Sequence, residues 1–217
     1  MAYVLINHGW TNTRQRGHWQ RSLAADLRNA GHQVFYPQYP NTQQPSFAEW
    51  SALLQAELEL LLETRAAASG EAATAEVIVI GHSLGCVNFI KAALQGNLSS
   101  VGLGQEATSS TGPLVDRVLF VAPPGPEKID TLPDFAVEAT AAEISQALNA
   151  VAGSVTLVGS DNDPWSPRGI QATYGDPLGL QAVVIPGAKH LSSSDGWSSW
   201  QGVFNWVNDS RSDLKVR

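Results

Sequence analysis

The sequence predicts an α/β fold with a doubly wound, mostly parallel sheet that carries helices on both faces. Predicted strands and helices alternate along the whole chain. The strands are continuous apolar runs, as in sheets that are covered on both faces. Hydrophobic residues make up 43% of the chain and charged residues only 15%, which is typical of a well-filled core. Because the chain has 217 residues and no internal repeat, we expect a single domain over residues 1–217.

Six short apolar segments are predicted as strands, at residues 3–6, 33–36, 76–80, 115–122, 154–158 and 182–185. Apolar residues at helical spacing predict helices over residues 18–29, from 46 to about 67, after 85, over 140–151 and over 197–207. Ser46 and Glu49 have the spacing of a capping box at the start of the second helix. Residues 96–112 are rich in Gly, Ser and Thr and are predicted as a loop, with a lid over the site as one interpretation.

The charge balance and the cysteine count exclude several classes of function. The chain has 13 Lys and Arg residues against 20 Asp and Glu residues, a formal net charge of −7, so no basic surface for nucleic acid or anionic membranes is expected. The single cysteine, Cys86, excludes an internal disulfide and cysteine-rich zinc sites, and we expect it to pack as a small buried side chain. The sequence shows no signal-peptide pattern and no apolar run of about 18 residues, which predicts a cytoplasmic protein.

The strongest chemical signal is the segment GHSLG at residues 81–85, a G-x-S-x-G pattern. It directly follows the strand predicted at 76–80 and precedes apolar residues at helical spacing, which is the context of a nucleophile elbow. The two glycines suit a turn that is too sharp for side chains at those positions. We therefore predict that Ser83 is a nucleophile, which needs a neighbouring base.

The partners of such a serine follow it along the chain, first an acid and then a histidine, each in a loop after a later strand. His190 follows the strand predicted at 182–185 and is the only histidine after His82. Two carboxylates, Asp161 and Asp163, follow the strand at 154–158. Asp163 is preferred because it opens an Asp-Pro-x-x-Pro turn, which would hold a carboxylate in place, and Asp161 remains the alternative.

Two backbone amides are candidates for the oxyanion hole. One belongs to Leu84, at the start of the helix after the elbow, and the other to Trp10, in the loop after the first strand. Gly9 allows the backbone of that loop to approach a ligand closely, whereas His8 is expected mainly to hold the loop. The candidate residues of the substrate pocket are His8, Gly9, Trp165 and Trp197.

Together these segments resemble the α/β-hydrolase superfamily over nearly the whole chain. Within it, the chain is most similar to the small serine hydrolases of the retinoblastoma-binding-protein-nine and YdeN-like type. The resemblance is carried by His8-Gly9, the His18-Trp19 pair, GHSLG with Cys86 after it, NDPWSP at 162–167, GAKH at 187–190 and DGWSSW at 195–200. It implies a compact α/β-hydrolase fold without a large cap, and a Ser–Asp–His triad.

Two hypotheses for the function follow. The first is a carboxylesterase-like serine hydrolase that cleaves small esters, thioesters or amides through an acyl-enzyme, with a small acyl substrate and no metal or organic cofactor. We expect such a protein to be a monomer or a weak homodimer. The alternative is a non-catalytic or weakly catalytic protein-interaction module on the same fold. The intact order of Ser83, an acid and His190 favours the enzyme.

Overall fold

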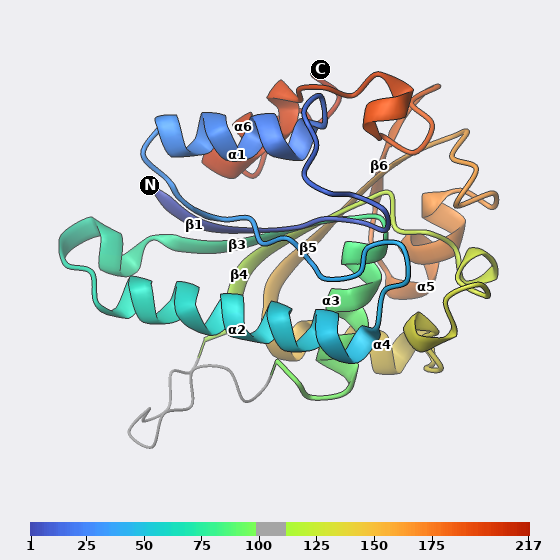
Figure 1. Ribbon diagram of the computed structural model, residues 1–217, viewed down its shortest axis with the longest axis horizontal. Coiled ribbons are helices and arrows are strands. Elements are labelled where there is room, and N and C mark those ends of the chain that lie inside the picture. The colour runs from blue at the N-terminus through green and yellow to red at the C-terminus, as the bar shows by residue number, and fades with distance from the viewer. Residues whose placement is uncertain (99–111) are drawn as a thin grey trace.

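The computed structural model describes residues 1–98 and 112–217, which form one six-stranded sheet between two layers of helices (Figure 1). The strands are β1 (Ala2–Asn7), β2 (Gln33–Phe35), β3 (Glu76–His82), β4 (Val115–Val121), β5 (Ala152–Ser160) and β6 (Ala182–Ile185). Neighbouring strands pair in parallel in the order β2-β1-β3-β4-β5-β6. The predicted doubly wound α/β fold is therefore confirmed. Residues 99–111, which include most of the predicted 96–112 loop, lie outside the described residues.

Helices cover both faces of this sheet (Figure 1). On one face lie α1 (Trp19–Asn29) and α6 (Gln201–Asn208), and on the other lie α2 (Phe47–Ala66), α3 (Leu84–Leu94) and α4 (Ala141–Val151). A π-helical turn (Gln171–Gly175) and the short α5 (Asp176–Leu178) precede β6 and were not predicted. Within the described ranges, no helix combines the length and the apolar character that a membrane span requires.

The two helical layers bury opposite sides of the central strand, because successive strand residues point to opposite faces. Val79 of β3 belongs to the same core cluster as Trp50 of α2. Its neighbour Ile78 belongs to the cluster that contains Trp19 of α1 and Trp206 of α6. These three indoles are at most 1% exposed, which places them in the core. The continuous apolar run in β3 thus reflects burial on both sides.

Two helix starts differ from the sequence prediction. Ser46 is the N-cap of α2, but its side chain makes no capping bond, so the predicted capping box is wrong. Burial of Phe47 and Trp50 fixes this end of the helix instead. The last helix begins at Gln201 rather than at Trp197, because Gly196 has φ 85° and a capped turn at Ser193–Asp195 interrupts the helical path.

His8 fixes the loop that follows β1. Its Nε2 accepts hydrogen bonds from the backbone N–H of Tyr39 (2.9 Å) and from Gln38 Nε2 (3.1 Å). Its Nδ1 donates to the Gly9 carbonyl (2.9 Å). Burial lowers the pKa of His8 to about 4, because the charged ring would lose its hydration and would present a proton to the Tyr39 N–H.

This environment predicts an acid-sensitive fold. His8 has its ordinary pKa near 6.5 in the unfolded chain and about 4 in the folded one, so its contribution is complete above about pH 6.5 and declines as the pH falls toward 4. We expect this one group to account for about 2 kcal/mol of the stability lost between pH 8 and pH 5. Urea unfolding of wild type and His8→Asn at both pH values measures it. An equally steep decline in both proteins would contradict the assignment.

Candidate active site

Ser83 occupies the sharp turn between β3 and α3, at the carboxyl edge of the sheet. Its backbone has φ 53° and ψ −125°, a conformation that a residue other than glycine adopts only when the surroundings impose it. The N–H of Ser83 donates to the carbonyl of Val121, the last residue of β4 (2.9 Å). The turn lies at the carboxyl end of β3, next to β1. Between these two strands the chain order of the sheet changes direction, and open α/β sheets bind their ligands at such a point.

Two glycines allow the turn to lie against the loop after β1. A Cβ on Gly85 would lie 2.6 Å from the carbonyl oxygen of Asn7 and 2.7 Å from that of His8. A Cβ on Gly9 would lie 2.8 Å from the Cβ of Ser83. These distances are too short for any side chain, and the nearby atoms are mostly backbone that cannot move away freely. Gly9 and Gly85 are therefore required by the close approach of the turn and the loop.

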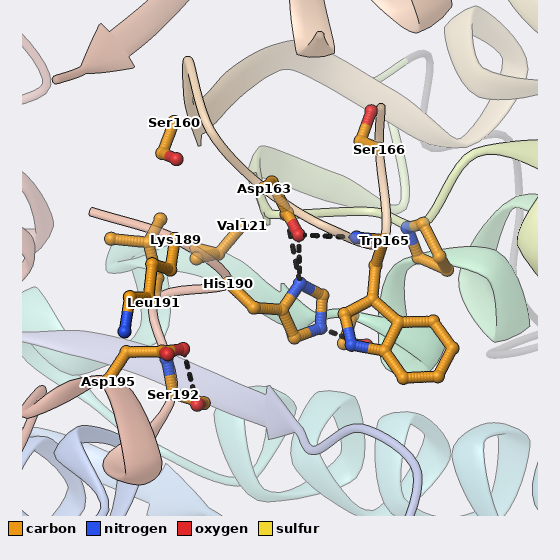
Figure 2. Close-up of polar contacts among 12 residues, drawn as sticks. Val121, Ser160, Asp163, Trp165, Ser166, Lys189, His190, Leu191, Ser192 and Asp195 are labelled. Carbon is orange, nitrogen blue, oxygen red and sulfur yellow. Dashed lines mark hydrogen bonds and ion pairs between the residues drawn. The ribbon is translucent and has the colours of Figure 1, made fainter. Parts of the chain in front are cut away.

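The His190 ring lies between Ser83 and the carboxylate of Asp163, and Figure 2 shows its contact with that carboxylate. Its Nε2 lies 2.8 Å from Ser83 Oγ, and its Nδ1 lies 2.9 and 3.0 Å from the two carboxylate oxygens of Asp163. Asp163 is 4% exposed, and it also accepts the N–H of Trp165 (2.8 Å). Asp161 is exposed and accepts the N–H of Gly187 instead (2.7 Å). The structure thus brings Ser83, His190 and Asp163 together and leaves Asp161 outside the arrangement.

The backbone around His190 is held by groups from distant segments. The residues on both sides of it have positive φ, 53° at Lys189 and 55° at Leu191. Three hydrogen bonds fix this conformation: His82 Nε2 to the His190 carbonyl (3.0 Å), Trp19 Nε1 to the Leu191 carbonyl (2.9 Å), and the Lys189 N–H to Asn162 Oδ1 (2.8 Å). Sequence reasoning missed these positioning roles, because no local pattern links residues so far apart in the chain.

Leu84 and Trp10 line the same cavity as Ser83. Within the part of the chain that the structure describes, neither N–H has a hydrogen-bond acceptor. The Leu84 amide is also the first of α3, where the unpaired N–H groups and the helix dipole favour negative charge. Two residues of the cavity lining therefore carry backbone donors that the fold leaves unpaired.

A cavity of about 400 Å³ opens at Ser83. Of the four residues predicted for the pocket, Gly9 and Trp165 line it. His8 and Trp197 do not: His8 is completely buried behind the loop, and Trp197 packs against Trp200 with Arg217 over its ring. The other lining residues are Thr11, Asn12, Gln15, His18, His82, Pro124, Lys128, Ile129, Leu132, His190 and Ser192 to Ser194, with Ser83, Leu84 and Trp10.

Two histidines of the cavity lining, His82 and His18, are held in their neutral form. Burial lowers the pKa of His82 well below its ordinary value and that of His18 to about 4, so both rings are neutral near pH 7. Burial also raises the pKa of the Cys86 thiol, which is fully enclosed and packs as predicted. No group of three or more His, Cys, Asp or Glu side chains in residues 1–98 and 112–217 is arranged to hold a metal ion.

Several solved structures share this architecture. The product of the ydeN gene from B. subtilis has a TM-score of 0.70 at 17% identity, over 96% of this chain and 97% of that one. A protein described as a YdeN-like hydrolase from Pectobacterium atrosepticum has a TM-score of 0.63 at 19% identity, over 100% and 94%. An esterase domain from a Rhodothermus marinus protein has a TM-score of 0.55 at 17% identity, over 90% and 82%.

At these identities the structural likeness shows a shared fold, and comparison with curated proteins gives no significant match. The family comparison goes further, because the model of the serine hydrolases matches residues 4–209, nearly the whole chain. The chain therefore belongs to the serine hydrolase family, and it shares its fold with the ydeN product and the YdeN-like hydrolase.

Proposed function

We propose that this serine hydrolase is a carboxylesterase that acts on small acyl esters with Ser83, His190 and Asp163 as its catalytic triad. One observation carries the proposal: Ser83 Oγ lies 2.8 Å from one nitrogen of His190, whose other nitrogen lies 2.9 Å from a buried carboxylate of Asp163. A serine, a base and a group that orients the base are what nucleophilic acyl transfer requires. The esterase domain among the structural neighbours supports the choice of esters.

In the first half of the reaction, Ser83 Oγ attacks the ester carbonyl carbon while His190 Nε2 takes the hydroxyl proton. Asp163 accepts from His190 Nδ1, so it fixes the ring orientation and stabilises the imidazolium. The carbon–oxygen bond to the alcohol then breaks, and Nε2 returns the proton to the departing oxygen. In the second half, water attacks the acyl carbon, gives a proton to Nε2, and the acid leaves as Ser83 Oγ is protonated again.

The tetrahedral intermediates carry a negative oxygen, which needs fixed donors. The free N–H groups of Leu84 and Trp10 supply them in this proposal, as the oxyanion hole. Because the elbow and the β1 loop pack without a Cβ at Gly9 or Gly85, both amides are held in place before the substrate arrives. Such preorganised donors contribute about 2.7–4 kcal/mol each to transition-state stabilisation.

Replacement of the nucleophile tests the reaction type. In Ser83→Ala we expect labelling by a fluorophosphonate probe to disappear and kcat for p-nitrophenyl butyrate to fall by at least about 10³-fold. Ser199→Ala serves as the control, because this exposed serine lies outside the cavity lining. Equal labelling of wild type and Ser83→Ala would overturn the proposal, and an unlabelled, inactive wild type would favour the interaction module.

The two carboxylates give a matched pair of variants. Asp163→Asn should lower kcat by about 10⁴-fold, because an amide at this place favours the wrong His190 tautomer. Asp161→Asn keeps an oxygen that can accept the Gly187 N–H, so we expect less than about threefold change. Steady-state kinetics with p-nitrophenyl butyrate compare them. A larger loss in Asp161→Asn would contradict the assignment.

Ile129 tests the acyl side of the cavity. It is 5% exposed and borders both the Ser83 cavity and a second, largely apolar cavity of about 340 Å³. In Ile129→Ala we expect the two spaces to join, so that kcat/KM for an octanoyl ester rises about tenfold relative to a butyryl ester. Ile129→Val is the conservative control and should keep the wild-type ratio. An unchanged ratio in folded Ile129→Ala would show that the second cavity takes no acyl chain.

A further inference from the structure

The cavity at Ser83 has two chemically unlike walls, which meet at His190. The His190 ring contacts the His82 ring, with centroids 5.2 Å apart, and the Trp165 ring, with centroids 5.9 Å apart. Polar side chains line the cavity on the His82 side of His190, and apolar side chains line it on the Trp165 side. The two walls therefore suit different halves of an ester, its acyl group and its alcohol.

The polar wall is built around the segment that follows His190. His18 packs on His82 with ring centroids 5.4 Å apart, and Ser192, Ser193 and Ser194 come directly after the base loop. Two hydrogen bonds tie the start of α1 to this segment, from Trp19 N to the Trp197 carbonyl (3.1 Å) and from Trp19 Nε1 to the Leu191 carbonyl (2.9 Å). The polar wall therefore consists of the His18 imidazole and the hydroxyl groups of Ser192, Ser193 and Ser194, on the His82 side of His190.

The apolar wall comes from other segments. Trp10 stands edge-on to Trp165, with centroids 6.0 Å apart, and the Trp165 carbonyl accepts the N–H of Gly125 (2.7 Å). Ile129 and Leu132 follow Gly125 along the chain, and their aliphatic side chains line the cavity. Figure 2 shows Trp165 and Ser192 on different sides of the His190 ring.

His18 carries a donor that the fold leaves unused. Its Nδ1 accepts the N–H of Gln20 (3.2 Å) as the N-cap of α1, so the neutral ring has its proton on Nε2. The low pKa of this buried ring, about 4, is consistent with the neutral form. Within the described residues Nε2 makes no hydrogen bond, and this atom is not fully buried although the residue is only 3% exposed, so it is open to the cavity that His18 lines. A ligand hydroxyl in the cavity can therefore accept from this donor in place of water.

We propose that the physiological substrate is an ester of a short apolar acid with an uncharged polyol. The hydroxyl groups of the polyol accept from His18 Nε2 and contact the serines of the polar wall. This inference rests on the proposed function, because it places the two halves of an ester that Ser83 would cleave against the two walls, with the alcohol on the polar one. The acyl chain then lies against Ile129 and Leu132. No carboxylate is present in the described lining, and its one ammonium group, Lys128, precedes Ile129. The polar wall therefore suits neutral hydroxyl groups.

Two butyrate esters of three-carbon alcohols test the proposal on the wild-type protein. Glycerol monobutyrate and propyl butyrate share the acyl group and differ only in two hydroxyl groups. After each kcat/KM is divided by the rate of hydroxide-catalysed hydrolysis, we expect the glycerol ester to be preferred at least about fivefold, as one or two neutral hydrogen bonds imply. A ratio near one would overturn the inference but leave the esterase intact. If neither ester is cleaved and the fluorophosphonate does not react, the proposed function fails as well.

The variant His18→Asn separates the two roles of this side chain. Asparagine is a good N-cap residue and retains an acceptor for the Gln20 N–H, but it cannot place a donor where Nε2 lies. We expect the glycerol-to-propyl preference to fall at least about threefold, mainly through KM for the glycerol ester. His32→Asn, the same change beyond the other end of α1, should keep the preference. A preference unchanged in folded His18→Asn would overturn the role of His18, and Ser193→Ala gives a second test of the same wall.

Discussion

The close contact between the Ser83 turn and the loop after β1 is the constraint on which the rest of the site depends. Gly9 and Gly85 leave no room for a Cβ, so two backbone segments meet at van der Waals distance. The contact holds Ser83 at a positive φ and brings Leu84 and Trp10 to one cavity. The strain of such a conformation, about 1–3 kcal/mol, is offset by a sheet that is buried on both faces.

The base loop depends on long-range contacts of a different kind. Three hydrogen bonds from distant segments hold the backbone around His190, and two of the residues that make them, His82 and Trp19, also pack against each other with ring centroids 5.8 Å apart. Burial disfavours protonation of His8, His18 and His82, whereas His190 faces the Asp163 carboxylate.

Much of the fold was predictable because its signals are local. Buried parallel strands need continuous apolar runs, and the six predicted runs all form strands. The signals that failed were weak for physical reasons. A capping box contributes little where Phe47 and Trp50 already fix the start of α2 by burial, and Trp197 has helical spacing but precedes the turn that Gly196 closes. The π-helical turn before α5 has no pattern of its own.

The sequence by itself determined the class of fold, the elbow at Ser83 and the order in which a carboxylate and a histidine follow it, because strand order and sharp turns depend on neighbouring residues. Only the tertiary structure separated Asp163 from Asp161, excluded His8 and Trp197 from the cavity lining, and placed His18 beside the site. These outcomes depend on which side chains meet across the carboxyl edge of the sheet. These contacts depend on packing between segments more than 100 residues apart, and no local sequence pattern predicts them.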